Sequence, residues 1–135
     1  MSEDDYQLII NCGIRYIDVA GRGGASWSRI EHLCNKDDGS CGLAFQDWGL
    51  TTVESLEEAE PFRDKLYLIA GGGIRSGIDL AKAIGLGAQM GSAALPFLKA
   101  ALESKDAVVR LIEKYREEFK IALFLTGGLD DKHRN

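Results

Sequence analysis

The chain has 135 residues, 45% of them hydrophobic, and its 21 acidic against 16 basic side chains give a net charge of −5. This length suits a single domain with an apolar core, and the acidic balance argues against non-specific nucleic-acid binding, which needs a basic face. No run of about 18 apolar residues is present, so we expect no membrane span. The acidic start of the chain has no apolar signal-peptide core, which makes a cytoplasmic location the expectation.

Apolar periodicity and turn-forming residues predict helices and strands in alternation. In chain order these are a helix over residues 4–12, a strand over 15–20, a helix over 26–33, a helix from 51 or 52 to about 60, a strand over 66–70, a helix from 76 to about 86, a strand over 89–94 and a helix from 100 or 104 to about 123. Strands separated by helices predict parallel pairing with right-handed crossovers. The predicted fold class is therefore α/β, with the unit spacing of a (β/α)8 barrel or a doubly wound sheet.

Two stretches lie outside this alternation. The connection over residues 25–48 is long and contains a polar loop over 35–42, and connections of this length are more often functional than idle. Trp27 and Trp48, which lie in this connection, suit packing in the core or at its rim better than a catalytic role. The tail from Gly127 onward is polar and is expected to fray.

Cysteine and histidine usage limits the chemistry. Cys12, Cys34 and Cys41 are an odd set without a Cys-x-x-Cys pair, so we expect free thiols in a reducing compartment. A zinc site of Cys34, Cys41 and His32 is the alternative, although this spacing matches no zinc pattern and a fourth ligand is missing. Since the second histidine, His133, lies in the polar tail, the sequence gives little support for acid–base catalysis by histidine.

Residues 66–79, Leu-Tyr-Leu-Ile-Ala-Gly-Gly-Gly-Ile-Arg-Ser-Gly-Ile-Asp, are the most informative stretch. An apolar run typical of a strand buried on both faces ends in the glycines 71–73, and a helix begins at once. Ser76 predicts a helix cap, and Asp79 resembles the second half of a capping box. The free N–H groups of this first turn form an anion site, to which Arg75 adds a cationic fork. Because ligands bind at the carboxyl ends of parallel strands, we favour phosphate binding here over a plain chain reversal.

Five segments, taken together and in order, resemble type 2 isopentenyl-diphosphate isomerase, a family of flavin-dependent (β/α)8 barrels. Residues 17–27, Ile-Asp-Val-Ala-Gly-Arg-Gly-Gly-Ala-Ser-Trp, resemble its strand-six motif, and residues 69–79 resemble its strand-seven phosphate loop. Residues 47–52 are similar to the start of the helix that follows strand six, 93–97 to the end of strand eight, and 122–128 to the C-terminal helix.

The resemblance implies that residues 1–135 are the C-terminal part of an FMN-dependent barrel domain, about strands six to eight with their helices. A whole barrel needs about 250 residues, so five upstream strands are missing. The candidate cofactor-binding residues are Ala20, Gly21, Gly23, Gly24, Ala25, Gly72, Gly73, Ile74, Arg75, Ala94 and Leu95.

Within this set the resemblance assigns different parts of the FMN contact. Residues 73–75 match the loop that holds the FMN phosphate, and residues 94–95 match a backbone contact beside it. Ala20 and Ala25 match two further contact positions. Relatives carry threonine at the position of Ala25, so a hydroxyl that can donate to the cofactor is replaced, and Ser26 is the alternative donor.

The activity that the resemblance implies is the interconversion of isopentenyl diphosphate and dimethylallyl diphosphate. Reduced FMN gives and takes a proton at carbon, and the protein supplies placement and electrostatics. NADPH keeps the flavin reduced, and Mg²⁺ binds the substrate diphosphate. The metal ligand, the substrate pocket and the catalytic residues are expected upstream of this chain, which would supply the FMN phosphate site and show no turnover alone.

Two alternatives stay open. The first is a fragment of another FMN-dependent barrel oxidoreductase, such as a hydroxy-acid oxidase or a glutamate-synthase-like dehydrogenase. The second is an inactive phosphate-binding or association module. Open sheet edges at Ile17 and Ala93 would seek partners, so we expect the isolated chain to self-associate as a homo-oligomer or to pair with a separate N-terminal fragment.

Overall fold

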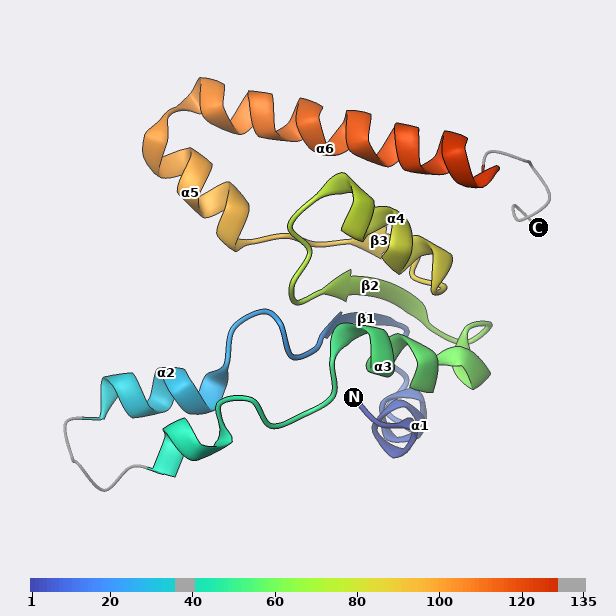
Figure 1. Cartoon of the computed structure of the whole chain (residues 1–135). Helices are drawn as coiled ribbons and strands as arrows, with labels where there is room; N and C mark the ends of the chain where they lie inside the picture. Colours follow the sequence, from blue (N-terminus) through green and yellow to red (C-terminus); the bar gives the residue numbers. More distant parts are fainter. Residues whose placement is uncertain (36–40, 129–135) are drawn as a thin grey trace.

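The computed structural model describes residues 1–35 and 41–128, and its centre is a parallel sheet (Figure 1). In spatial order the strands are β1 (Tyr16–Ala20), β2 (Tyr67–Gly71) and β3 (Met90–Gly91). Ala20 is the register partner of Gly71, and β3 pairs with β2 in the same direction. The carboxyl ends of the strands therefore meet at one edge of the sheet. The predicted α/β fold with parallel strands is confirmed.

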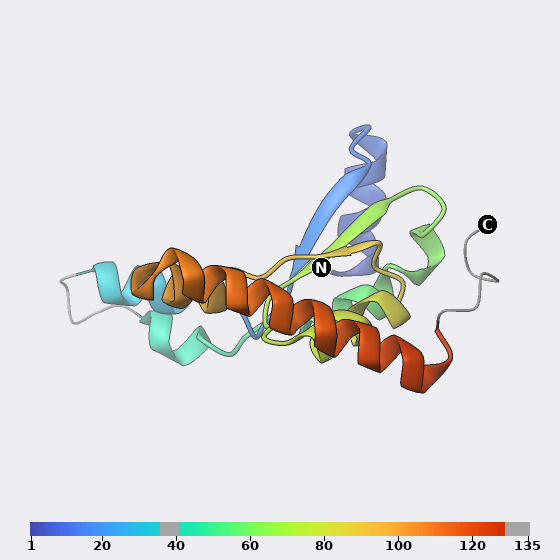
Figure 2. The same ribbon diagram turned by 90° about the horizontal axis from the view of Figure 1, so that it is seen from above.

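Helices and short 3-10 turns precede, connect and follow these strands. They are α1 (Glu3–Asn11), α2 (Trp27–Cys34), η1 (Cys41–Phe45), α3 (Thr52–Glu58), η2 (Glu60–Phe62), α4 (Gly77–Gly85), α5 (Leu95–Glu103) and α6 (Lys105–Thr126). The long helix α6 packs along α4, and α2 packs beside η1 at a distance from the sheet (Figures 1 and 2). No helix in the described part of the chain is long and apolar enough to cross a membrane.

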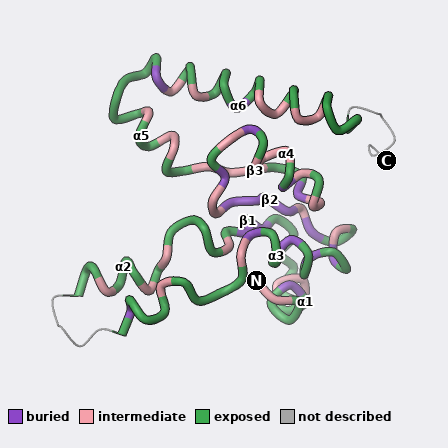
Figure 3. The backbone as a smooth tube through the Cα atoms, viewed as in Figure 1, coloured by how far each residue is buried: buried purple, intermediate pink, exposed green. Residues whose placement is uncertain are grey.

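The hydrophobic core lies on one face of the sheet. Side chains along β1 alternate between exposed and buried, and the buried ones are Ile17 and Val19. Leu68 and Ala70 are the corresponding core residues of β2. The helices cover this face with Tyr6 of α1, Leu56 of α3, Ala83 of α4 and Tyr115 of α6. Figure 3 shows the buried positions gathered along the strands and α3, and the opposite face of β1, with Tyr16 and Asp18, is left exposed.

The C-terminal helices differ from the prediction of a single helix from residue 100 or 104. The structure has two helices, because α5 begins at Leu95 and α6 at Lys105. Pro96 lies in the first turn of α5, where its missing N–H costs no helical hydrogen bond. Between the two helices Ser104 is extended, and its Oγ accepts a hydrogen bond from the N–H of Ala107, which starts α6.

The predicted strand over residues 89–94 is too long, since β3 has only two residues. The N–H of Ser92 still donates to the Ala70 carbonyl, at 2.9 Å, before the backbone leaves for α5. The predicted helix over 26–33 is confirmed as α2. Most of the predicted loop over 35–42 and of the predicted frayed tail lies outside the described residues, and the last residues of the loop belong to η1.

Candidate functional site

Two glycine-rich loops meet at the carboxyl edge of the sheet. One follows β1 over residues 20–25, and the other follows β2 over residues 71–75. They are packed so closely that a Cβ atom on Gly24 would lie 2.9 Å from the Cα of Gly72. The Arg75 guanidinium also donates a hydrogen bond to the Gly23 carbonyl, at 3.2 Å. The structure therefore brings together the predicted site residues of the first two strands.

The conformation of the second loop requires glycine. Gly72 and Gly73 have φ angles of +71° and +93°, which L-residues with a side chain rarely adopt. In the described part of the chain, no hydrogen-bond acceptor is paired with the N–H of Gly73 or of Ile74. These donors are available to an anion, as the sequence predicts for this loop.

A third segment, which the sequence analysis did not connect with the site, closes the loops from the side of α3. The N–H of Arg22 donates to the Leu50 carbonyl at 2.8 Å. The hydroxyl of Thr52 lies 2.8 Å from the carbonyl oxygen of Gly71 and 2.7 Å from that of Gly72. The start of α3 is itself fixed, since Thr51 and Glu54 form a capping box, and the backbone N–H of Thr51 lowers the pKa of Glu54.

The first turn of α4 is largely satisfied by the protein itself. Ser76 caps the helix as predicted, because its Oγ accepts from the N–H of Asp79 at 3.1 Å. The Asp79 carboxylate, however, accepts from the N–H of Arg75 rather than from that of Ser76. A carboxylate oxygen of Glu118 on α6 accepts from the N–H of Gly77 at 2.8 Å. These contacts occupy the N–H groups of Gly77 and Asp79 in the first turn, whereas those of Gly73 and Ile74 in the loop before the helix have no acceptor among the described residues.

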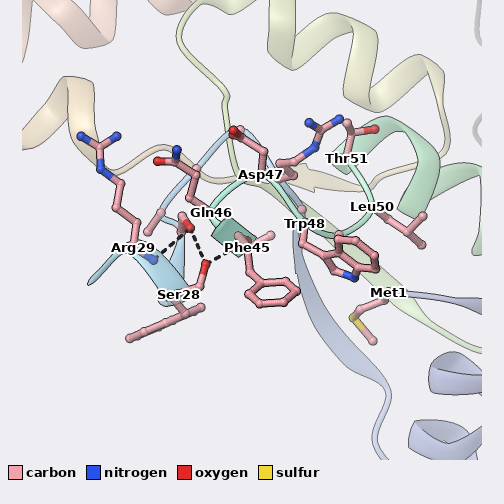
Figure 4. A pocket seen from close by; sticks show the side chains of 18 of the residues that line it. Met1, Ser28, Arg29, Phe45, Gln46, Asp47, Trp48, Leu50 and Thr51 are labelled. Carbon is pink, nitrogen blue, oxygen red and sulfur yellow. Dashed lines mark hydrogen bonds between the residues drawn. The ribbon is translucent and has the colours of Figure 1, made fainter. Parts of the chain in front are cut away.

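A hollow of about 900 Å³ lies on the outer side of the β1 loop (Figure 4). Its walls are the β1 loop, the start of α2 and residues 45–51, and it reaches Arg75. Its lining residues include three arginines, Arg22, Arg29 and Arg75, and one carboxylate residue, Asp47. This lining gives the hollow a net positive charge, although the chain as a whole is acidic.

Ala25 and Ser26 line this hollow. The Ser26 Oγ accepts from the N–H of Arg29, at 3.3 Å, as the cap of α2, and it also contacts the Ser28 hydroxyl. A hydroxyl that accepts still has a hydrogen to donate, so Ser26 stays the alternative to the threonine hydroxyl that is missing at residue 25.

Trp27 and Trp48 line the same hollow and are not core residues. The two residues are 80% and 81% exposed. The predicted packing of the tryptophans in the core is therefore wrong, and packing at the rim of the core is the alternative that remains. Phe45 and Trp48 meet edge to face with ring centroids 5.9 Å apart.

Ala94 and Leu95, the predicted contacts from the third strand, lie where β3 leads into α5. They follow the carboxyl end of the sheet, but no hydrogen bond within the described residues joins them to the glycine loops. On the open face of the sheet beneath, the Ser92 hydroxyl donates to the Asp18 carboxylate at 2.8 Å.

No group of three or more metal-binding side chains forms in the described residues, so His32, Cys34 and Cys41 do not assemble the alternative zinc site. The three cysteines are free and exposed, which agrees with the predicted free thiols.

Paired glycine loops with unpaired N–H donors, at the carboxyl edge of a parallel sheet, are typical of phosphate-binding α/β enzymes. The family model described as FMN-dependent dehydrogenase matches residues 1–131, and the chain belongs to this family.

Its relatives include the isopentenyl-diphosphate delta-isomerase of Hydrogenovibrio crunogenus, which is 47% identical over 129 residues. The protein of the same name from Paracoccus zeaxanthinifaciens is 50% identical over 132 residues. Each alignment covers 94% of this chain and 38% of the relative. The resemblance stated from the sequence is confirmed, and the chain spans little more than a third of these relatives.

Solved structures share the fold. A mandelate oxidase mutant with an FMN adduct superposes with a TM-score of 0.65 at 26% identity, over 94% of this chain and 35% of that one. A flavocytochrome b2 mutant with benzoylformate gives a TM-score of 0.67 at 25% identity, over 93% of this chain and 29% of that one.

Proposed function

We propose that this chain supplies the FMN phosphate-binding part of an enzyme that interconverts isopentenyl diphosphate and dimethylallyl diphosphate. The observation that carries the proposal is the contact between the two glycine loops, with donors at Gly73 and Ile74 that no described residue uses. Identities of 47% and 50% to proteins named isopentenyl-diphosphate delta-isomerase support this reaction.

The residues of the loops fit a phosphate monoester. Its dianion would accept charge-assisted hydrogen bonds from the N–H groups of Gly73 and Ile74, and the guanidinium of Arg75 would add positive charge. The glycines and alanines of residues 20–25 leave the backbone open to a flat ring system, and Ala94 and Leu95 would add contacts from the third strand. When bound, reduced FMN supplies the proton transfer at carbon, and these residues hold its tail in place.

The remaining parts of the reaction are proposed to lie upstream of this chain. They are the catalytic residues, the Mg²⁺ ligands and the pocket for the substrate diphosphate. NADPH as the reductant of the flavin, a cytoplasmic location and a homo-oligomeric assembly complete the proposal. The family resemblance is the support for each of them.

The shape of the sheet supports completion by further strands. Both of its outer strands, β1 and β3, have one unpaired edge among the described residues. The face opposite the core carries Tyr16 and Tyr67, with ring centroids 5.3 Å apart, and the half-exposed Met90. We infer that these edges and this face belong to a partial (β/α)8 barrel, which an upstream part closes.

The test is a chimera in which this chain replaces the matching C-terminal third of the Paracoccus zeaxanthinifaciens relative. Flavin fluorescence during titration with FMN and with riboflavin measures the contribution of the phosphate. We expect FMN to bind at least about tenfold more tightly, since several charge-assisted hydrogen bonds are lost with riboflavin. Equal affinities would refute the phosphate site, and a chimera that binds FMN without converting isopentenyl diphosphate would refute the reaction.

A hydroxy-acid oxidase is the second candidate function. The observation in its favour is the structural similarity to mandelate oxidase and flavocytochrome b2. Their identities of 26% and 25% are about half of those to the isomerases. Oxidation of a 2-hydroxy acid by the chimera, without isomerase activity, would favour this candidate.

A further inference from the structure

Thr52 is a buried polar residue whose hydroxyl lies between α3 and the loop after β2. Thr52 is only 8% exposed. The hydroxyl has one hydrogen to donate, and both acceptors within reach are carbonyl oxygens, those of Gly71 at 2.8 Å and of Gly72 at 2.7 Å. Two successive peptide carbonyls therefore converge on one side chain.

Because the peptide bond is planar, the direction of each carbonyl also determines the direction of the N–H in the same peptide group. In a trans peptide the C=O and the N–H of the next residue point in opposite directions, and the chain has no cis peptide bond in the described residues. The N–H groups of Gly72 and Gly73 must therefore both point away from Thr52. On that side of the loop, no acceptor in the described residues is paired with either N–H group, so both donors are open to an anion.

The packing around Gly72 leaves this arrangement little freedom. A Cβ atom on Gly72 would lie 2.5 Å from the Gly21 carbonyl oxygen and 2.9 Å from the Thr52 Oγ1. Downstream, the N–H groups of Arg75 and Gly77 are bound by carboxylates of the protein. The N–H groups of Gly72 and Gly73 have no such acceptor within the described part of the chain. Thr52 is the side chain that donates to the carbonyls of the same two peptide groups.

We propose that Thr52 is a positioning residue for anion binding: by holding the carbonyls of Gly71 and Gly72, it orients the N–H groups of Gly72 and Gly73 toward the ligand phosphate. This role rests on the proposed FMN function for the identity of the ligand. The orientation of the two peptide groups is a property of the chain without ligand and is measured separately.

The test compares the 135-residue chain with its Thr52→Val and Thr52→Ser variants by amide NMR. Valine keeps the shape of the side chain without its hydroxyl, and serine keeps the hydroxyl. A matched control is Thr126→Val, which removes a hydroxyl that donates to the Ala122 carbonyl at 2.8 Å in α6. Thr52→Ala is the second variant if the Thr52→Val chain does not fold.

Without ligand, we expect the amide chemical shifts of Gly72 and Gly73 to change in Thr52→Val, because the carbonyl groups of the same two peptide units lose their donor. The amide shifts of Leu68 should not change. Thr52→Ser and the control at Thr126 should match the parent chain at both glycines. Unchanged amide shifts at both glycines in Thr52→Val would overturn the positioning role, whatever the ligand is.

With ligand, FMN and riboflavin are titrated against the chimera described above, with threonine, valine or serine at residue 52, and flavin fluorescence gives the affinities. We expect Thr52→Val to lose about tenfold in FMN affinity and little in riboflavin affinity, with the loss restored by serine. Equal FMN affinity with threonine and valine at residue 52 would overturn the positioning role while the FMN function stands. Equal affinity of the parent chimera for both flavins would overturn the FMN function, and the amide shifts measured without ligand then decide on Thr52.

Discussion

At the scale of single residues, the positive φ angle of Gly72 and the close packing around it each make a separate contribution to the stability lost when Gly72 is replaced by alanine. Gly72→Ala should destabilise the chain by about 2–4 kcal/mol, because alanine is strained at this φ angle and its Cβ would contact Gly21 and Thr52. Gly13 is a matched control, since its φ is +78° but nothing lies within 4 Å of an added Cβ. Gly13→Ala should cost about 1–2 kcal/mol.

The free energy of unfolding in urea measures both substitutions. Equal losses for Gly72→Ala and Gly13→Ala would show that strain alone, without the packing of the two loops, accounts for the glycine at residue 72.

Tyr6 predicts a fall in stability at alkaline pH. Its side chain is fully buried and its Oη donates to the Ser55 carbonyl at 2.8 Å; burial, with smaller effects of nearby carboxylates, raises its pKa from 10.0 to about 12. Because the folded chain holds the phenol proton more tightly than the unfolded chain, this contribution is complete below pH 10 and disappears as the pH rises to about 12.

Urea unfolding between pH 8 and 12 measures this effect. The parent chain should lose stability over the upper two pH units, and Tyr6→Phe should have a shallower profile while being about 1–3 kcal/mol less stable at neutral pH, since the Ser55 carbonyl loses its donor. Tyr16→Phe is the control, because Tyr16 is exposed. A profile for Tyr6→Phe as steep as that of the parent would assign the alkaline fall to other groups.

The glycines of the candidate site could be predicted from the sequence, whereas the Thr52 side chain that donates to their carbonyls could not. A run of three glycines after an apolar strand indicates a ligand loop by its composition alone. The contacts of Thr52 join positions 19 and 20 residues apart. The local capping-box pattern marks Thr51, with Glu54 three residues later, as the helix cap, and nothing local indicates the contacts of Thr52. The carboxylate of Glu118 on Gly77 spans 41 residues and could not be predicted for the same reason.

At the scale of elements, the packing of α6 against the start of α4 fixes the end of the loop that follows β2. A Cβ on Gly77 would meet the backbone of Tyr115 and Phe119, so the two helices touch through a residue without a side chain. Glu118 completes the contact by accepting from the Gly77 N–H at 2.8 Å, and Lys114 pairs with the same carboxylate.

Glu118→Ala should destabilise the chain by about 1–3 kcal/mol, because the N–H of Gly77 is left without its acceptor. Glu118→Gln keeps an acceptor oxygen and should recover most of this loss. The control is Glu117→Ala, which removes an exposed pair with Lys120 and should change stability by less than about 0.5 kcal/mol. Thermal unfolding of the three variants is the measurement, and equal effects at residues 117 and 118 would contradict the capping role.

The boundary between α5 and α6 shows where local sequence signals compete. Pro96 is compatible with the end of a strand and with the first turn of a helix, and the prediction took the first of these. Ser104 is a good helix cap, which the sequence analysis allowed for, but the helix before it was not foreseen. Element type was therefore predictable for the long periodic α6 and not for the short α5.

At the scale of the whole molecule, one face of β1 and one edge each of β1 and β3 are uncovered in the described residues, and the proposed partial barrel predicts that further strands cover them. We expect the chain to associate with the N-terminal two-thirds of the Paracoccus zeaxanthinifaciens relative, added as a separate polypeptide. Light scattering should detect the complex, and thermal unfolding should give a higher melting temperature for the mixture than for the chain alone. The control is the same addition to the chain with Tyr16→Lys, which places a charge on the open sheet face and should weaken association by about tenfold or more.

A parent chain that stays monomeric, melts cooperatively and ignores the added front part would contradict the partial barrel. The alternation of helices and strands was sufficient to predict the three parallel strands. Which face of the sheet is left uncovered could not be predicted, because it depends on how the helices pack across the chain.

The carboxylate of Asp18 on the open face limits which strand can join the edge of β1. A second copy of β1 added in parallel register would bring Asp18 opposite its own twin, and like charges directly opposite one another are unfavourable. Edge strands of natural proteins use such charges to deter pairing with themselves. A strand that pairs with the edge of β1 should therefore place a basic or uncharged side chain opposite Asp18. A single acidic residue thus disfavours stacking of identical copies of β1 into a fibre and favours pairing with a strand of different sequence.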